Sequence, residues 1–169
     1  MRVLDTKLKV SIAAQVCCAV AYLHLQPQPI VHRDIKPANI LVNEYFVTKL
    51  CDLGLGKSDL FSKTLQSTHV GRWRGTLLYM APEILLENKE ANENSDIWSL
   101  GCTLLELFSE KHVWNVSTVN NMIAKLINQE TPSIEGFPRN LQVEMGKCFY
   151  YNSAKRPNIS RLLRLLEEK

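Results

Sequence analysis

The sequence of 169 residues predicts a mainly α-helical domain with one small β-hairpin. Apolar residues recur at helical spacing along most of the chain. Residues 95–108 are apolar almost all round, which is typical of a helix buried in the middle of a domain. Only two short runs, Ile40–Val42 and Val47–Leu50, have the composition of strands. The length fits one domain, which at this size buries roughly 70% of the surface of its unfolded chain.

The first half of the chain is predicted to hold one long helix and the hairpin. Residues 5–24 form a helix in this interpretation, because an apolar residue recurs about every fourth position. Pro27 and Pro29 end it. A turn at Asn43–Phe46 then joins the two strands. Residues 51–80 are rich in Gly, Ser and Thr and are predicted to be irregular, as functional or mobile segments often are.

The second half is predicted to be helical. In the central helix, Ser95 is expected to be the N-cap and Asp96 to lie in the first turn. Three more helices are expected at residues 117–129, 139–150 and 158–168, each with an apolar stripe.

Composition excludes several classes of protein. The net charge is only +3 and no basic run is present, so nucleic-acid binding is not expected. Four of the five cysteines lie in apolar surroundings, which predicts reduced, buried thiols and a location in the cytosol or nucleus. No apolar run is expected to approach the length needed to span a bilayer, and residues 1–15 carry too many charges for a signal peptide. A membrane partner is therefore not expected.

Charged and amide residues are concentrated between apolar segments at positions 31–42, VHRDIKPANILV. Asp34, Lys36 and Asn39 are spaced two and three residues apart, and Asp52 follows Asn39 after a further thirteen. Asparagine and aspartate supply the hard oxygen ligands that Mg²⁺ prefers, and a lysine can offset phosphate charge. Ordinary surface loops do not combine charged and strand-forming residues in this way, so the pattern indicates a functional site.

Five motifs in this chain resemble those of eukaryotic-type protein kinases, in the order of that family. Residues 32–39, HRDIKPAN, are similar to the catalytic loop, and Asp52-Leu53-Gly54 resembles the magnesium-binding element with Leu in place of Phe. The remaining three are Gly75-Thr76 with Ala81-Pro82-Glu83, the run SDIWSLG at residues 95–101, and Arg156-Pro157. The chain is thereby identified as a member of this family, and its fold is expected to be a protein-kinase-like C-terminal lobe.

The resemblance implies roles for the catalytic residues. Asp34 would accept or orient the proton of the substrate hydroxyl, and Lys36 would offset charge on the γ-phosphoryl group. Asn39 and Asp52 would bind Mg²⁺, and Leu41 would lie beneath adenine. The implied ATP site is therefore made by Lys36, Asn39, Leu41 and Asp52. Leu53 remains apolar, so it is expected to pack beneath Asp52.

It also implies roles for the activation segment, residues 52–83. Arg33 would pair with a phosphate on Ser67 or Thr68, and Thr76 would contact Asp34. Lys36 together with Gly75-Thr76 favours serine/threonine specificity.

Three structural residues follow from the same resemblance. Glu83 and Arg156 would form a buried ion pair beneath the activation segment. Asp96 would accept hydrogen bonds from the backbone of the catalytic loop.

The resemblance covers less than the family's whole domain. Only 31 residues precede His32, and none of the seven glycines precedes Gly54, so the glycine-rich loop and the strand lysine of the N-terminal lobe are absent. Residues 1–169 are interpreted as a partial kinase domain, expected to be inactive alone, whose partners are ATP, a protein substrate and an N-terminal lobe or a partner protein. The alternative is a non-catalytic docking or decoy module derived from a kinase. The intact polar set favours the first interpretation.

Overall fold

The computed structural model describes residues 4–53 and 75–167. Its helices are α1 (Thr6–His24), α4 (Pro82–Leu85), α5 (Glu93–Ser109), α6 (Val119–Ile127), α7 (Arg139–Gly146) and α8 (Ile159–Glu167), and its strands are β1 (Ile40–Val42) and β2 (Thr48–Leu50). Short 3₁₀ helices lie at Pro37–Asn39, Ile134–Gly136, Lys147–Phe149 and Ser153–Lys155. The predicted domain, mainly helical with one hairpin, is confirmed, and the predicted helices agree with these bounds to within a few residues.

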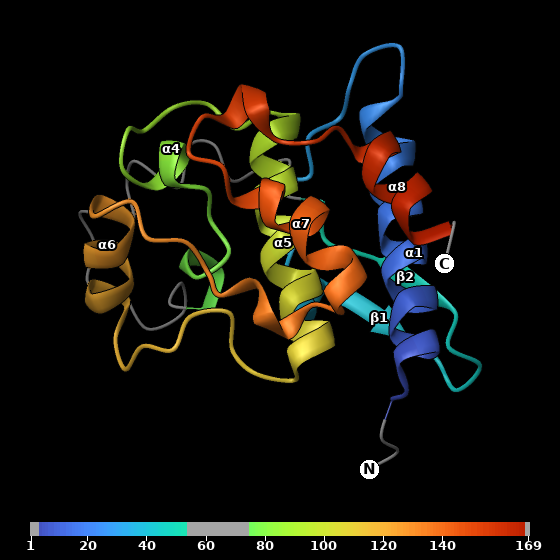
Figure 1. Ribbon diagram of the computed structural model, residues 1–169. Helices are drawn as coiled ribbons and strands as arrows, with labels where there is room; N and C mark the ends of the chain where they lie inside the picture. The colour runs from blue at the N-terminus through green and yellow to red at the C-terminus, as the bar shows by residue number, and fades with distance from the viewer. Residues whose placement is uncertain (1–3, 54–74, 168–169) are drawn as a thin grey trace.

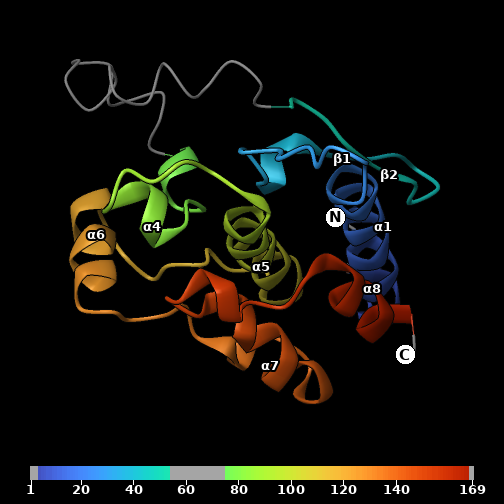
Figure 2. The same cartoon turned by 90° about the horizontal axis from the view of Figure 1, so that it is seen from above.

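Helix α5 lies in the middle of the molecule. Seen from above, α1 and α8 lie on one side of it, α4 and α6 on the other, and α7 below (Figures 1 and 2). Trp98, Leu100 and Leu104 of α5 are at most 1% exposed. The apolar character of this helix on all sides follows from this position, because every face of it meets another element.

The N-terminus of α5 differs from the sequence prediction. The N-cap is Asn92, whose side chain accepts hydrogen bonds from the backbone N–H groups of Asn94 and Ser95. Ser95 is the third residue of the helix, and its hydroxyl accepts in return from Asn92 N at 3.0 Å. The prediction that Ser95 caps the helix is therefore wrong. The two residues form a reciprocal capping box, so the helix begins one turn earlier than the apolar pattern indicates.

Gly101 permits a close approach to α5. A Cβ atom at this position would lie 2.7 Å from Cys148 Cβ and 3.1 Å from Phe149 Cε1. The 3₁₀ helix Lys147–Phe149 therefore packs directly on the backbone of α5, and any larger residue would push it away.

By length and composition alone, helix α1 is long and apolar enough to cross a membrane, with 19 residues and a mean hydropathy of 1.3. The expectation that no run approaches that length is therefore wrong. A helix in the core of a folded domain can have the same length and composition, and 44% of this apolar stretch is buried. Because α1 packs against α8, α5 and β2, its apolar residues are those of a helix that forms part of the core.

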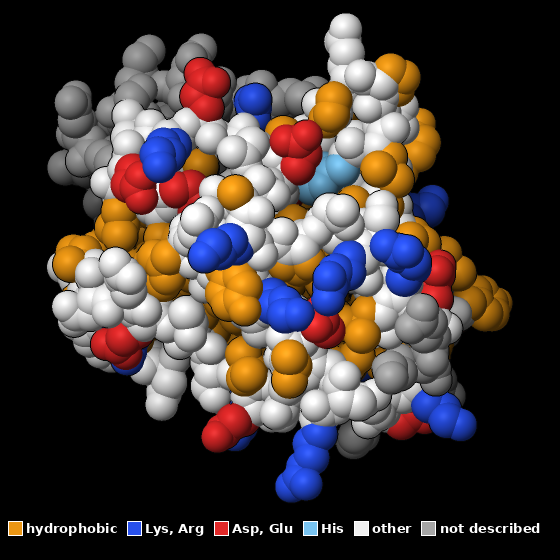
Figure 3. Space-filling model, turned by 45° about the horizontal axis from the view of Figure 1, so that its top comes forward, with side chains coloured by type: hydrophobic (Ala, Val, Ile, Leu, Met, Phe, Trp, Pro, Cys, Tyr) orange, Lys and Arg blue, Asp and Glu red, His pale blue; other side chains and the backbone are white. Residues whose placement is uncertain are grey.

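All five cysteines are free thiols, but their burial differs from the expectation of four in apolar surroundings. Cys17, Cys102 and Cys148 are buried, Cys51 is half-buried and Cys18 is exposed on α1. Charges on the surface are mixed in sign: on the face drawn in Figure 3, basic side chains lie among acidic and apolar ones.

The hairpin is antiparallel, with Ile40 opposite Leu50 and Val42 opposite Thr48. Asn43 closes its turn, since its side-chain oxygen accepts from Tyr45 N at 3.0 Å and from Val47 N at 2.9 Å. The hairpin lies beside α1 (Figure 2). At the end opposite the turn, Asn39 precedes β1 and Asp52 follows β2 by two residues. The pairing of the strands therefore sets how far apart these two residues lie.

Candidate active site

The catalytic loop is fixed to α5 by one carboxylate. Asp96 Oδ2 accepts from His32 N at 2.7 Å, and its Oδ1 accepts from Arg33 N at 2.9 Å. Asp96 is 1% exposed. Arg33 adopts a left-handed backbone conformation with φ of 68°, which is costly for a residue with a side chain and persists where surrounding contacts hold it.

The same carboxylate binds a histidine from α1. His24 Nε2 lies 2.9 Å from Asp96 Oδ2, and both side chains are buried. The contact joins residues 72 apart, and no local pattern in the sequence indicates it.

His32 connects the catalytic loop to the end of β2. Its Nδ1 accepts from Asp34 N at 3.3 Å, and its Nε2 lies 3.1 Å from the carbonyl oxygen of Cys51. Because Nδ1 accepts, Nε2 carries the hydrogen and donates to that carbonyl. The buried ring thus has a structural position between the loop with Asp34 and the residue before Asp52.

Two predicted residues, Lys36 and Asn39, contact the carboxylate of Asp34. Lys36 Nζ lies 3.0 Å from Asp34 Oδ2, and Asn39 Nδ2 donates to the same oxygen at 2.9 Å. Asn39 Nδ2 also donates to the backbone oxygen of Asp34 at 2.7 Å. Lys36 donates in addition to Thr76 Oγ1 at 2.8 Å, so Thr76 reaches the site through Lys36. A half-buried ammonium and a buried amide therefore orient one buried carboxylate.

The backbone of Asn39 pairs with that of Cys51, the residue before Asp52, although twelve positions separate the two. The N–H of Cys51 donates to the backbone oxygen of Asn39 at 2.9 Å, and Asp52 follows with φ of 59° at an exposed position. The Nδ2 of Asn39 is engaged with Asp34, which makes its Oδ1 the atom that can face a cation. An amide oxygen and a carboxylate fit Mg²⁺, which is usually held by one or two protein ligands together with substrate phosphates and water.

No group of three or more His, Cys, Asp or Glu within residues 4–53 and 75–167 is placed to hold a metal ion. The protein groups at this position are therefore too few to form a complete metal cage. A site made by Asn39 and Asp52 would depend on phosphate oxygens for the rest of its ligands.

The apolar residues assigned to the nucleotide lie on the surface. Leu41 is 58% exposed on β1, where a planar base could lie on it. Leu53 is 45% exposed and follows an exposed Asp52 beyond the end of β2. That Leu53 packs beneath Asp52 stays a prediction.

Arg33, the residue before Asp34, is exposed. Its predicted phosphate partners, Ser67 and Thr68, lie outside the described residues, as do the glycine of the Asp52-Leu53-Gly54 motif and the rest of residues 54–74.

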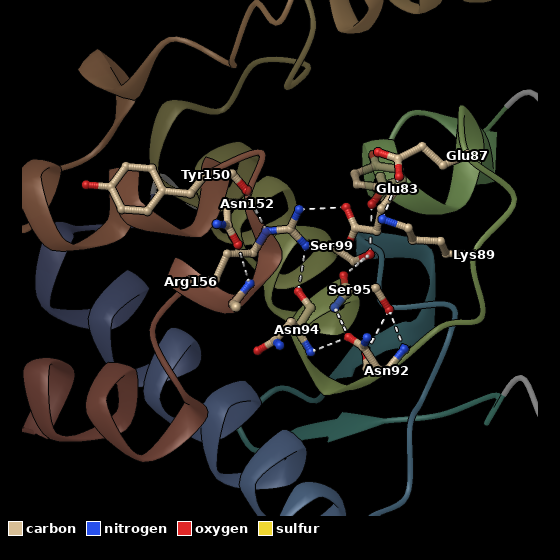
Figure 4. Close-up of polar contacts among 12 residues, drawn as sticks. Glu83, Glu87, Lys89, Asn92, Asn94, Ser95, Ser99, Tyr150, Asn152 and Arg156 are labelled. Atoms are coloured by element: carbon tan, nitrogen blue, oxygen red, sulfur yellow. Dashed lines mark hydrogen bonds and ion pairs between the residues drawn. The ribbon is translucent and has the colours of Figure 1, made fainter.

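The structure brings Glu83 and Arg156 together, 73 positions apart (Figure 4). The guanidinium donates from Nη1 to Glu83 Oε1 at 2.6 Å and from Nη2 to Oε2 at 2.7 Å, while its Nε donates to Tyr150 O at 2.8 Å. Arg156 also lies over the ring of Trp98, 5.1 Å from the centroid. The pair joins α4, where the segment of residues 52–83 ends, to the C-terminal part of the chain. Arg156 also donates to Asn94 O of the central helix α5.

Two cavities lie near these elements. A small one of about 30 Å³ opens beside Asp34 and is lined by Thr76, Tyr79 and Met80 among others. A larger one of about 490 Å³ lies between α1, the hairpin and α5, and its lining includes Ile12, Val16 and Leu107. The smaller cavity is the one lined by Asp34, so the candidate active site lies there although the other cavity is larger.

The described residues thus form a set of helices around a buried central helix, with a carboxylate, an ammonium and an amide meeting beside a two-stranded hairpin. The model of the protein kinase domain family matches residues 2–165 of this chain. The chain belongs to the protein kinase domain family.

Curated relatives agree with this assignment. The chain is 33% identical over 150 residues to "Serine/threonine-protein kinase Nek1" of Mus musculus, a match covering 88% of this chain and 12% of the mouse protein. It is 37% identical over 154 residues to "Mitogen-activated protein kinase kinase kinase YODA" of Arabidopsis thaliana, covering 88% of this chain and 16% of that protein. It is 33% identical over 165 residues to "Serine/threonine-protein kinase BCK1/SLK1/SSP31" of Saccharomyces cerevisiae, covering 94% and 11%. The chain thus spans less than a fifth of the length of each of these three relatives.

Proposed function

We propose that this chain is the lower half of an ATP- and Mg²⁺-dependent protein kinase that transfers phosphate to serine and threonine hydroxyls of a protein substrate. The observation that carries the proposal is the arrangement around Asp34: Lys36 Nζ at 3.0 Å and Asn39 Nδ2 at 2.9 Å from the same oxygen. The names of the relatives and the match to the family support it.

Phosphoryl transfer requires positioning and charge neutralisation more than covalent chemistry from the protein. Bound Mg²⁺–ATP would supply the phosphoryl group and the charge that holds it. Asp34 would orient the acceptor hydroxyl and accept its proton. Lys36 contacts both Asp34 and Thr76, so its ammonium would hold the carboxylate toward the acceptor and balance phosphate charge beside it.

The exposed apolar side chains of the hairpin support a covering partner. Leu41 and Val47 are 58% and 49% exposed, and both share one face of the hairpin, because Leu41 pairs with Lys49 and Val47 lies two positions before it. Apolar side chains that gather on an exposed face often mark a site of interaction. We propose that an N-terminal kinase lobe, from the same polypeptide or from a partner protein, covers this face. We place the protein in the cytosol or nucleus, in keeping with its free thiols.

The proposal is tested by joining residues 1–169 to the N-terminal lobe of a related kinase. The fusion is incubated with radiolabelled Mg²⁺–ATP and peptides that differ only in carrying Ser, Thr or Tyr. Asp34→Asn serves as the blank. We expect labelling of the Ser and Thr peptides that falls in the blank by about 10²–10⁴-fold, the usual contribution of a general base. Equal labelling in the Asp34→Asn fusion would refute the proposal, and a fusion that binds substrate peptide without labelling it would favour the docking or decoy module.

A further inference from the structure

One side chain of α1 completes the outer edge of the hairpin. Gln15 Nε2 donates to the carbonyl oxygen of Phe46 at 3.0 Å, and its Oε1 accepts from Thr48 N at 2.8 Å. Gln15 is half-buried between the helix and the hairpin. A primary amide has a donor and an acceptor side by side, so it can pair with both backbone groups at once.

These two backbone groups point away from β1. Val47, which lies between them, directs its own groups inward: its oxygen accepts from Asn43 N at 3.1 Å, and its N–H donates to the Asn43 side chain at 2.9 Å. Alternate residues of a strand face opposite sides, so Phe46 O and Thr48 N lie on the outer edge. Gln15 therefore pairs with β2 as a neighbouring strand would.

An isolated two-stranded hairpin is only marginally stable in water, and an unpaired edge adds to this weakness. Here the hairpin has two strands of three residues each. The Gln15 amide hydrogen-bonds the hairpin, next to its turn, to α1, a helix that forms part of the core. The position of the hairpin is thereby set by the body of the domain and not by the turn at Asn43 alone.

The opposite end of this hairpin carries the two proposed metal ligands. β1 begins directly after Asn39, and β2 ends two residues before Asp52. The link from Cys51 N to Asn39 O, 2.9 Å, holds these ends together. A hairpin that shifts relative to α1 would carry Asn39 and Asp52 with it, away from Asp34.

We propose that Gln15 is a positioning residue for the Mg²⁺–ATP site, acting through the hairpin. This inference rests on the proposed function, because it assumes that Asn39 and Asp52 bind the metal. Gln15 hydrogen-bonds to Phe46 and Thr48, near the turn of the hairpin, so its effect would be on the geometry of the ligands at the other end.

The test compares variants of the full chain. Gln15→Met has nearly the same shape but cannot pair with the edge, whereas Gln15→Glu keeps the acceptor for Thr48 N and loses the donor to Phe46 O. Gln142→Met is the matched control, because Gln142 Nε2 also donates to a backbone carbonyl, that of Phe137 at 3.0 Å, on the distant helix α7. Amide hydrogen exchange of Thr48 is measured by NMR in each variant.

We expect Thr48 to exchange at least about tenfold faster in Gln15→Met, because local opening of the edge would no longer cost a hydrogen bond of about 1.4 kcal/mol. Gln15→Glu should lie between it and the unsubstituted chain, and Gln142→Met should leave Thr48 unchanged. Equal exchange in all four proteins would overturn the inference, because the amide would then contribute nothing to the edge.

The second measurement uses Mn²⁺ with ATP as a paramagnetic probe of the metal site. Broadening of the backbone amide signals of Asn39 and Asp52 is followed during a titration. We expect the midpoint to rise by about fivefold in Gln15→Met, somewhat less than the 10–100-fold typical of residues that contact a metal ligand directly, and to stay unchanged in Gln142→Met. Faster Thr48 exchange with an unchanged midpoint would make Gln15 purely structural and overturn the inference alone. Absence of broadening at Asn39 and Asp52 in the unsubstituted chain would instead contradict the proposed function, and this inference with it.

Discussion

His24 Nε2 lies 2.9 Å from Asp96 Oδ2, and both side chains are buried behind the loop that carries Asp34. The same carboxylate accepts the N–H groups of His32 and Arg33 at 2.7 and 2.9 Å. One side chain of α5 thus joins the end of α1 to the catalytic loop. The position of Asp34 depends on this junction, because Arg33, the residue before it, is held in a left-handed conformation by its bond to Asp96.

Replacing Asp96 should therefore destabilise the domain strongly. Asp96→Ala leaves two buried N–H groups and a buried histidine without their acceptor, a loss typically worth about 3–5 kcal/mol. Asp96→Asn keeps an acceptor oxygen and should cost less. Urea unfolding measures both changes. A cost for Asp96→Ala below about 1 kcal/mol, the size of a single ordinary hydrogen bond, would show that Asp96 does not anchor the loop.

The ion pair between Glu83 and Arg156 should behave as one unit. Glu83→Ala leaves Arg156 buried without its carboxylate, which typically costs about 3–5 kcal/mol of unfolding free energy. Arg156→Ala also removes bonds to Tyr150 O and Asn94 O, at 2.8 and 2.9 Å, so it should cost at least as much. The double variant should cost less than the two single variants summed, because contacting residues are not additive. Strict additivity in the double-mutant cycle would contradict the contact.

The buried thiols should be unreactive in the folded protein. Burial raises the pKa of Cys148 from 9.0 to about 12 and also raises the pKa values of Cys17 and Cys102. The thiolate is the reactive form, so these three should react with a disulfide reagent only on unfolding, whereas exposed Cys18 should react in the native state. Cys18→Ser is the control and should remove most of the fast reaction.

The same pKa shifts predict the pH dependence of stability. A raised pKa means that the folded state keeps these protons above pH 9, where the unfolded chain releases them. The unfolded chain then binds fewer protons than the folded one, so the unfolding free energy should decrease as pH rises above about 9. This contribution is complete below that pH. Urea unfolding between pH 8 and 10.5 measures it, and a constant midpoint over this range would contradict the burial of the thiols.

Local periodicity was sufficient to predict the helices and the hairpin of this chain. Residues 5–24 were predicted and Thr6–His24 are observed, because one face of that helix is apolar and is buried against α8 and α5. The start of α5 was predicted at Ser95, whereas the helix begins at Glu93. The first turn, which contains Glu93 and Asn94, is polar, so apolar spacing cannot indicate it, and only the pairing of Asn92 with Ser95 does.

Contacts between distant residues were predictable only where a motif indicated them. Glu83 and Arg156 meet as the family resemblance implies, and so do Asp96 and the catalytic loop. His24 and Gln15 were missed, because their partners lie 72 and 31 or more positions away and neither residue belongs to a motif that the sequence reveals. A polar residue on a helix is usually solvated, and only the folded arrangement shows which one meets a backbone edge.

The last prediction is that residues 1–169 alone do not transfer phosphate at a useful rate. In the proposed site, Asn39, Asp52 and Lys36 would approach the phosphates from one side only. Leu41 is 58% exposed, so a bound base would face solvent on its other side. Holding reactants in line can lower a barrier by about 7–11 kcal/mol, and an open site forfeits most of that. The purified chain is incubated with radiolabelled Mg²⁺–ATP and a serine/threonine substrate, with Asp34→Asn as the blank. Labelling above the blank at rates near those of intact kinases, roughly 1–100 per second, would show that no covering lobe is needed.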